Sequence, residues 1–205
     1  MLKVGLTGGI ASGKSTILAM FADLGAHTLR ADVVSHRLMA PGEPVYDRIV
    51  AAFGTQILAL DGTIARPRLA SAAFPDRIAE LNAIVHPDVM IFEDNWMRQV
   101  GQTDPDGVAI CEAALLIEAG ARPRYHKLIV VTCTLEQKIS RFAERTGITL
   151  EAARIEVQRR MAAQMPEEEK AKLADFVIDN SGRREDTVHR VAELWQQLTA
   201  EAQHH

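Results

Sequence analysis

The chain has 205 residues, of which 47% are hydrophobic and 24% are charged, and its formal net charge is −4. This length suits one buried α/β domain with inserted pieces and is too short for two large independent domains. The acidic balance argues against a general binder of nucleic acids or anionic membranes, because such proteins usually carry a surplus of basic residues. We therefore expect no nucleic-acid partner and no membrane association.

The two cysteines, Cys111 and Cys133, lie inside apolar runs that are typical of strands. Buried free thiols explain them better than a disulfide or a metal-binding pair. The residues after Met1 carry no charged leader with an apolar core, so we expect no removable presequence and a cytoplasmic location.

The first elements expected along the chain are a strand, a helix and a second strand. The first strand covers residues 2–7, and the helix follows Lys14 and stops before Gly25. Apolar residues at helical spacing indicate that helix. The second strand, over residues 26–31, is weaker and leads directly to Asp32.

A helical region follows, in which we expect no strong strand. Prolines are expected to begin helices over residues 45–53 and 68–74, and another helix covers residues 78–85. Pro87 is expected to begin a separate helix that runs to about residue 100. The whole stretch is interpreted as an insertion into the sheet domain.

The sheet is expected to resume at residues 108–112 and 128–132, where compact apolar runs suit buried parallel strands. Thr134 and Gln137 form a capping box for a helix that ends near Gly147. A second helix (150–163), a last strand (176–179) and an amphipathic helix complete the chain. Strands that alternate with helices predict a doubly wound, mostly parallel α/β sheet that binds ligands at the carboxyl ends of its strands.

The strongest motif is Gly8-Gly9-Ile10-Ala11-Ser12-Gly13-Lys14-Ser15, which matches GxxxxGK[ST] between a strand and a helix. The glycines permit unusual dihedral angles, and successive N–H groups then point at phosphates. Lys14 supplies positive charge to the β- and γ-phosphate oxygens, and Ser15 offers a hydroxyl ligand for Mg²⁺. Thr16 extends the helix whose positive dipole end faces the anion. The motif predicts an ATP-using phosphotransferase with Mg²⁺.

Other P-loop proteins fit the sequence less well. A GTPase would need a DxxG turn after a strand and an NKxD motif, but Asp104 to Gly107 precedes its strand and NKxD is absent. Motor and transporter ATPases are usually larger. The size and the helical insertion favour a small-molecule kinase.

The remaining motifs resemble the dephospho-CoA kinase family from residue 3 to about residue 182. The marks are Leu6 to Ser15, Ala31-Asp32 with His36, Pro41-Gly42, Phe53-Gly54, Asp61-Gly62 with Arg66, Leu69 and Phe74, His86-Pro87, Leu115-Leu116-Ile117-Glu118, and Ala174-Asp175 through Asp179-Asn180-Ser181-Gly182. Each is short, but their order and spacing together are specific.

The resemblance implies a P-loop NTPase-type fold with three parts. Residues 1–32, 105–138 and 172–205 form the nucleotide-binding core, residues 33–104 a helical acceptor-binding region, and residues 139–171 a helical lid. The implied reaction moves the ATP γ-phosphate to the ribose 3′-hydroxyl of 3′-dephospho-coenzyme A, in a protein expected to be monomeric. Another small-metabolite or nucleoside-monophosphate kinase is an alternative, and a nucleotide-binding regulatory module without catalysis is a second one.

Three positions depart from the pattern of that family. Ala11 replaces a usual glycine, which the loop tolerates if this residue keeps a negative φ. Arg30 replaces the first acidic residue of an Asp-Ala-Asp sequence, so that only Asp32 remains. Ala114 replaces a proline.

The catalytic residues expected from position and resemblance are Asp32, Lys14 and Arg141. Asp32 follows the second strand and is either a catalytic base or a helix cap, and the resemblance favours the base. Arg141 and Arg145 lie four residues apart on one helical face. They either close over the phosphates, with Arg145 contacting ATP, or belong to a solvated face.

The other candidate residues depend more heavily on the resemblance. Glu112 ends an apolar strand, where it either faces Mg²⁺ or is simply solvated. The resemblance implies acceptor contacts for Thr7, Asp32, His86, Leu115 and Glu118, and adenine contacts for Asn180 and Gly182.

Overall fold

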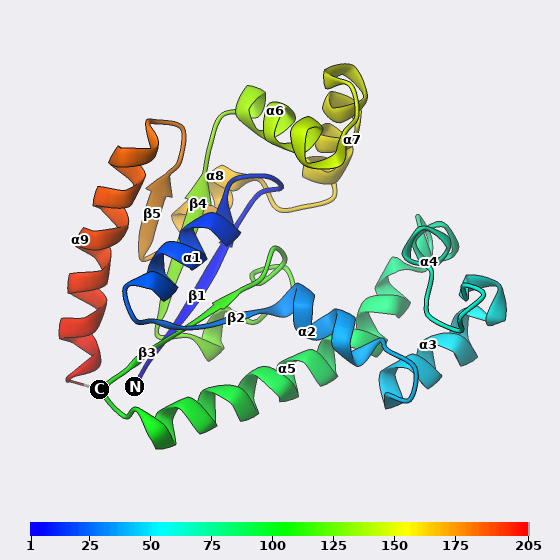
Figure 1. Cartoon of the computed structure of the whole chain (residues 1–205), viewed down its shortest axis with the longest axis horizontal. Coiled ribbons are helices and arrows are strands. Elements are labelled where there is room, and N and C mark those ends of the chain that lie inside the picture. Colours follow the sequence, from blue (N-terminus) through cyan, green and yellow to red (C-terminus); the bar gives the residue numbers. More distant parts are fainter. Residues whose placement is uncertain (205) are drawn as a thin grey trace. The chain divides into compact units, whose positions relative to one another are not determined.

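The computed structural model describes residues 1–204 and divides them into two compact units. The first unit comprises Met1–Leu29 and the described residues from Met97 onward, and the second is Arg30–Trp96. Figure 1 shows the elements of both units in chain order. The finer division into core, acceptor region and lid stays a prediction.

A five-stranded sheet in the order β2-β3-β1-β4-β5 forms the centre of the first unit. Its strands are β1 (Leu2–Gly8), β2 (His27–Arg30), β3 (Val108–Glu112), β4 (Lys127–Thr132) and β5 (Phe176–Asp179). β1 pairs in parallel with β3 and with β4, and β4 pairs in parallel with β5. This topology confirms the predicted α/β fold and brings the carboxyl ends of β1 and β3 together.

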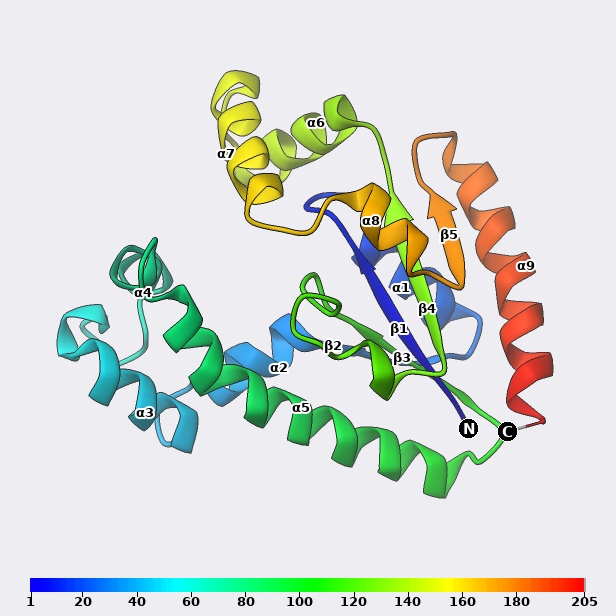
Figure 2. The same ribbon diagram turned by 180° about the vertical axis from the view of Figure 1, so that it is seen from behind.

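Helices cover both faces of this sheet. Helix α1 (Lys14–Asp23) and helix α9 (Arg184–Ala202) pack on one face, and the short helix α8 (Glu167–Lys172) lies on the other (Figures 1 and 2). Buried side chains from α1, α9 and the strands form one apolar cluster, which includes Ile17, Phe21, Leu194, Leu6 and Ile129. The strands are buried on both faces of the sheet, which explains the continuous apolar runs in their sequences.

Helices α6 (Leu135–Thr146) and α7 (Leu150–Ala162) form a hairpin beyond the end of β4 (Figure 1). The predicted capping box of Thr134 and Gln137 is confirmed, and Gly147 ends α6 with a φ of 70°. Phe142 and Val157 form the apolar contact between the helices, and Ile10 from the P-loop packs into the same cluster. The hairpin therefore contacts the phosphate loop directly.

The second unit is helical, as predicted. It contains α2 (Ala31–Leu38), α3 (Pro44–Phe53), the short 3-10 helix η1 (Thr55–Ile57), α4 (Arg66–Ala73) and most of α5 (Ile78–Thr103). A further 3-10 helix, η2 (Arg122–Arg124), lies in the first unit.

The prediction that Pro87 begins a new helix is wrong, because α5 continues through it. An internal proline removes one hydrogen bond and costs about 3 kcal/mol. Val85 and Val89 lie two residues on either side of Pro87 and are 6% and 7% exposed. Burial of these flanking side chains favours a continuous helix.

Cys111 and Cys133 are free and buried, as predicted. Within residues 1–204, none of the helices has the length and apolar character needed to cross a bilayer.

Candidate active site

The P-loop connects β1 to α1, and two of its glycines have no room for a side chain. Gly8 has a φ of 151°, and a Cβ there would lie 2.3 Å from the carbonyl oxygen of Val131. Gly13 has a φ of 98°, and its Cβ would lie 2.1 Å from Nδ2 of Asn180. Contacts under 3.0 Å require a rearrangement. Both glycines are therefore needed for the close approach of the loop to its neighbours.

Ala11 adopts a left-handed conformation with a φ of 54°. The condition under which the loop would tolerate alanine without strain, a negative φ, is therefore not met. A residue with a Cβ is strained in this region because the Cβ approaches the following carbonyl oxygen. The loop imposes this conformation even though the sequence provides alanine rather than glycine.

The Lys14 side chain is folded back into the loop and is 8% exposed. Its Nζ donates hydrogen bonds to the carbonyl oxygens of Gly8 and Gly9 at 3.2 Å and 2.9 Å. Burial lowers the pKa of the Lys14 ammonium, and the nearby Glu112 carboxylate opposes that shift. A charged amine held among carbonyl oxygens is poised to transfer its hydrogen bonds to phosphate oxygens.

Ser15 and Glu112 bring together two oxygen-bearing side chains that could hold Mg²⁺. Ser15 Oγ donates to the carboxylate of Glu112, which ends β3 and is 7% exposed. Among the described residues no group of three or more His, Cys, Asp and Glu side chains could hold a metal ion. Mg²⁺ usually takes only one or two protein ligands together with substrate phosphates, so this pair fits it.

A pocket with a volume of about 240 Å³ lies beside the P-loop, between α1, α6 and the loop after β5. The guanidinium of Arg141 bridges its walls by donating to the Ser12 carbonyl oxygen at 3.3 Å and to the Asn180 carbonyl oxygen at 3.0 Å. Asn180 Nδ2 donates to the same Ser12 carbonyl oxygen at 2.8 Å. The pocket is lined by Gly13, Thr16, Met20, Arg141, Asn180, Gly182 and Arg184.

This pocket gathers five of the residues selected from sequence, namely Gly13, Thr16, Arg141, Asn180 and Gly182. Arg184 was not selected. Arg145 lies elsewhere on α6, with its guanidinium 5.3 Å from the centre of the Phe142 ring. Its positive charge contributes to lowering the pKa of Lys14, so Arg145 lies within electrostatic reach of the P-loop.

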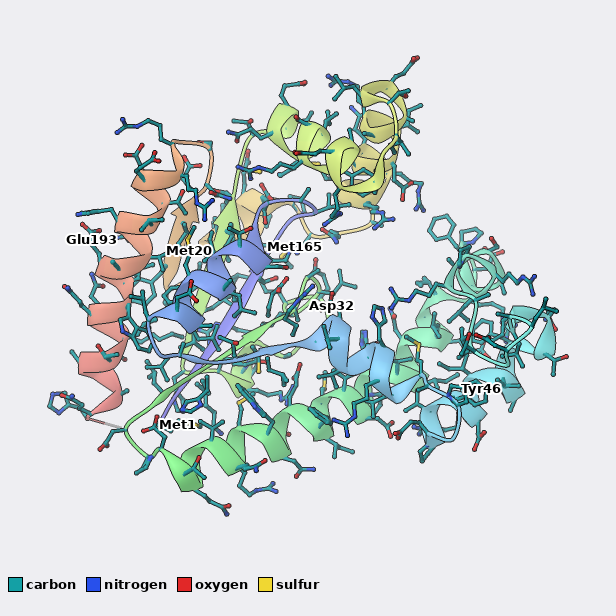
Figure 3. All side chains as sticks on the ribbon, viewed as in Figure 1. Met1, Met20, Asp32, Tyr46, Met165 and Glu193 are labelled. Carbon is teal, nitrogen blue, oxygen red and sulfur yellow. The ribbon has the colours of Figure 1, made fainter. Side chains whose placement is uncertain are left out.

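Asp32 lies in the first turn of α2, in the second unit (Figure 3). Its Oδ2 is 2.9 Å from Nη2 of Arg30, the residue that departs from the family pattern. Its other oxygen accepts a hydrogen bond from the Val33 N–H at 2.9 Å. A negative side chain is favourable near a helix N-terminus. Its role as a base stays a prediction.

The residues selected for acceptor binding have varied surroundings. Thr7 is buried, and its hydroxyl donates to the carbonyl oxygen of Ala114 at 3.3 Å. Glu118 pairs with Lys170 at 2.8 Å and accepts a hydrogen bond from the Met165 N–H. Leu115 is half-buried, and so is His86 of the second unit, where burial lowers the pKa of the imidazole. Their contacts with the acceptor stay predictions.

Sequence reasoning missed three charged residues near the P-loop, namely Lys138, Glu167 and Lys170. Glu167 accepts a hydrogen bond from the Gly9 N–H and pairs with Lys138. Lys170 is fully buried. Three acidic residues after Pro166 could have indicated the start of α8, but their spacing does not reveal what the helix contacts.

The chain is similar to known proteins over nearly its whole length. A family model described as dephospho-CoA kinase matches residues 2–186. A dephospho-CoA kinase from Geobacter metallireducens is 42% identical over 199 residues, which cover 96% of each chain. A crystal structure of a Thermus thermophilus protein aligns with a TM-score of 0.76 at 32% identity and covers 96% of this chain and 97% of that one. A dephospho-CoA kinase from Campylobacter jejuni, 24% identical with a TM-score of 0.69, covers 97% of this chain and 98% of its own and shares the fold.

Proposed function

Because the chain belongs to the dephospho-CoA kinase family, we propose that it transfers the γ-phosphate of ATP to the ribose 3′-hydroxyl of 3′-dephospho-coenzyme A. The products are coenzyme A and ADP, and this reaction is the last step of coenzyme A biosynthesis. The observation that carries the proposal is the P-loop, where Lys14 lies buried within the loop and Ser15 contacts Glu112.

Binding of ATP would use three parts of the site: the P-loop, the neighbouring pocket, and the pair of Ser15 and Glu112. The N–H groups of the loop from Ile10 to Thr16 would face the phosphates, and Lys14 would exchange the Gly8 and Gly9 carbonyl oxygens for phosphate oxygens. The adenine would lie in the pocket that Arg141 and Asn180 line. Mg²⁺, held by Ser15 and Glu112, would offset negative charge on the β- and γ-phosphates.

Asp32 would accept the proton of the 3′-hydroxyl as the new O–P bond forms. The bond between the γ-phosphorus and its bridging oxygen breaks, and ADP leaves with that oxygen. Because phosphoryl transfer has a loose transition state, orientation of the hydroxyl by Asp32 matters as much as removal of its proton.

The α6–α7 hairpin would act as a lid over the phosphates. Arg141 and Arg145 project from α6 near the P-loop, and guanidinium groups neutralise charge that develops during transfer. A closed lid also excludes water, which competes with the acceptor as nucleophile. We also propose that the protein is a monomer and that it is located in the cytoplasm.

Release of ADP measured with a panel of acceptors tests the acceptor assignment. The panel contains 3′-dephospho-coenzyme A, AMP, shikimate and gluconate. Strong turnover with 3′-dephospho-coenzyme A alone is expected. Turnover confined to another acceptor would support the alternative of a different small-metabolite kinase, and tight ATP binding without transfer to any of them would support a regulatory module.

A further inference from the structure

One carboxylate that the reaction described above does not use lies directly against the phosphate loop. Glu167 begins α8, and its Oε1 accepts a hydrogen bond from the Gly9 N–H at 3.0 Å. Its Oε2 lies 2.6 Å from Nζ of Lys138, which belongs to α6. One side chain therefore joins the P-loop, the first helix of the lid and the helix that follows the lid.

The ion pair between Glu167 and Lys138 is largely shielded from water. The Lys138 side chain is 3% exposed and that of Glu167 is 18% exposed. A buried ammonium needs an opposite charge and hydrogen-bond partners. Removing one member of a buried ion pair destabilises a protein more than removing one member of a surface pair, because the remaining charge is left buried without a partner. The negative charge of Glu167 also raises the pKa of Lys14 against the effect of burial, which places it within electrostatic reach of the phosphate-binding amine.

At position 9 a glycine is needed for this contact and not for an unusual backbone angle. Its φ lies outside the left-handed region, unlike those of Gly8 and Gly13. A Cβ on Gly9 would lie 2.2 Å from Oε1 of Glu167. The absence of a side chain at Gly9 is therefore what allows the carboxylate to reach the N–H group.

A buried charge one turn further along α8 anchors the helix as well. Lys170 Nζ pairs with Glu118 at 2.8 Å and donates to the carbonyl oxygen of Ala114 at 3.0 Å. The Glu118 carboxylate also accepts a hydrogen bond at 3.0 Å from the N–H of Met165, which lies in the connection from α7 to α8 and is labelled in Figure 3. Glu167 thus extends from a helix that Glu118 and Ala114 hold in place through Met165 and Lys170.

We propose that Glu167 is a positioning residue for phosphoryl transfer, which holds Gly9 in place and couples the lid to the loop that binds ATP. The inference rests on the proposed kinase function. Loss of the contact releases the start of the P-loop and loosens the link between α6 and the phosphates. Weaker ATP binding and a less water-tight lid follow from that loss.

Kinetics of Glu167→Ala, with Glu168→Ala as the matched control, test this inference. Glu168 is the adjacent residue of α8, carries the same charge and is exposed. We expect Glu167→Ala to raise the KM for ATP about tenfold, the effect of losing one hydrogen bond to a charged group. The rate of ATP hydrolysis without acceptor should rise relative to transfer. Glu168→Ala should leave both quantities at the wild-type values.

Two further variants separate positioning from a general loss of structure. Glu167→Gln keeps an acceptor oxygen for the Gly9 N–H and should have an intermediate KM for ATP. Gly9→Ala displaces the carboxylate without altering it, so the Gly9→Ala/Glu167→Ala double variant should be no worse than the more impaired single variant. If Glu167→Ala does not fold, Glu167→Gln and Gly9→Ala provide the test.

The inference is overturned if Glu167→Ala matches Glu168→Ala in both measurements, or if the effects of Gly9→Ala and Glu167→Ala add in full. Failure of the proposed function is a distinct result, since the wild-type protein would then not use 3′-dephospho-coenzyme A. In that case the ratio of hydrolysis to transfer, measured with the acceptor that is used, still tests Glu167.

Discussion

The hydroxyl of Ser15 lies 3.2 Å from Oε1 and 3.1 Å from Oε2 of Glu112 and donates its hydrogen bond to that carboxylate. Ser15 lies in the first turn of α1, and Glu112 ends β3, where it is opposite Leu6 of β1. The parallel pairing of β1 with β3 therefore brings together two residues that are 97 positions apart in the chain.

Glu112→Gln should weaken the use of Mg²⁺. An amide keeps a hydrogen-bond acceptor for Ser15 but removes the negative charge that favours the cation. We expect the Mg²⁺ concentration for half-maximal activity to rise about tenfold or more, because loss of even a residue that only supports a metal ligand lowers metal affinity by about that factor. Glu136→Gln, at an exposed carboxylate of α6, is the control. An unchanged Mg²⁺ titration would remove Glu112 from the site.

Asp32→Asn should lower kcat by at least about 100-fold, because the variant has no base to accept the hydroxyl proton. The KM for ATP should change little, since the phosphates are bound by the P-loop. Asp47→Asn in α3 is a control in the same unit, at an exposed position. Near wild-type turnover of a correctly folded Asp32→Asn protein would show that Asp32 is not the base.

Ala11→Gly should stabilise the protein. Alanine at a φ of 54° is strained, and replacing it with glycine removes a strain of about 1 kcal/mol from the folded state. Glycine also has more conformational freedom in the unfolded chain, which offsets part of this gain in the free energy of unfolding. Urea unfolding of both proteins measures the difference. A lower midpoint for the glycine variant, with an unchanged slope, would contradict the assignment of strain to Ala11.

Glu156 of α7 should contribute stability that depends on pH. Hydrogen bonds from Arg159 and Arg160 lower the pKa of its carboxyl from 4.5 to about 2 in the folded protein. A depressed carboxyl pKa gives stability that is fully present above pH 4.5 and is lost as the pH falls toward about 2. The contribution should be at most about 1 kcal/mol, because the group lies near the surface.

Comparison of wild-type protein with Glu156→Gln tests this sign. The difference in the free energy of unfolding should be constant at neutral pH and should shrink as the solution is acidified. A difference that grows on acidification would contradict the lowered pKa.

Local sequence patterns identified the elements that depend on short-range chemistry. The strands Val108–Glu112 and Phe176–Asp179 have the predicted bounds, and the Thr134 capping box is present. Pro87 was misleading because burial of neighbouring side chains outweighs a local helix-breaking preference. The φ of Ala11 could not be predicted, because the fold of the P-loop, rather than the residue type, determines that angle.

The contact between Gly9 and Glu167 could not be predicted, since the two residues are 158 positions apart and no spacing rule connects them. The same holds for Lys170 and Glu118, whose pairing depends on how α8 docks on the sheet. Sequence indicated the P-loop residues that we expect to contact phosphate, whereas the charged side chains that lie against this loop became visible only in the structure.

The most direct test of the central claim is identification of the phosphorylated product. Purified protein incubated with ATP, Mg²⁺ and 3′-dephospho-coenzyme A is followed by ³¹P NMR of the acceptor. We predict a new phosphate monoester at the ribose 3′ position, formed in equal amount with ADP. A phosphate at any other position of the acceptor, or ADP formed without a phosphorylated acceptor, would contradict it.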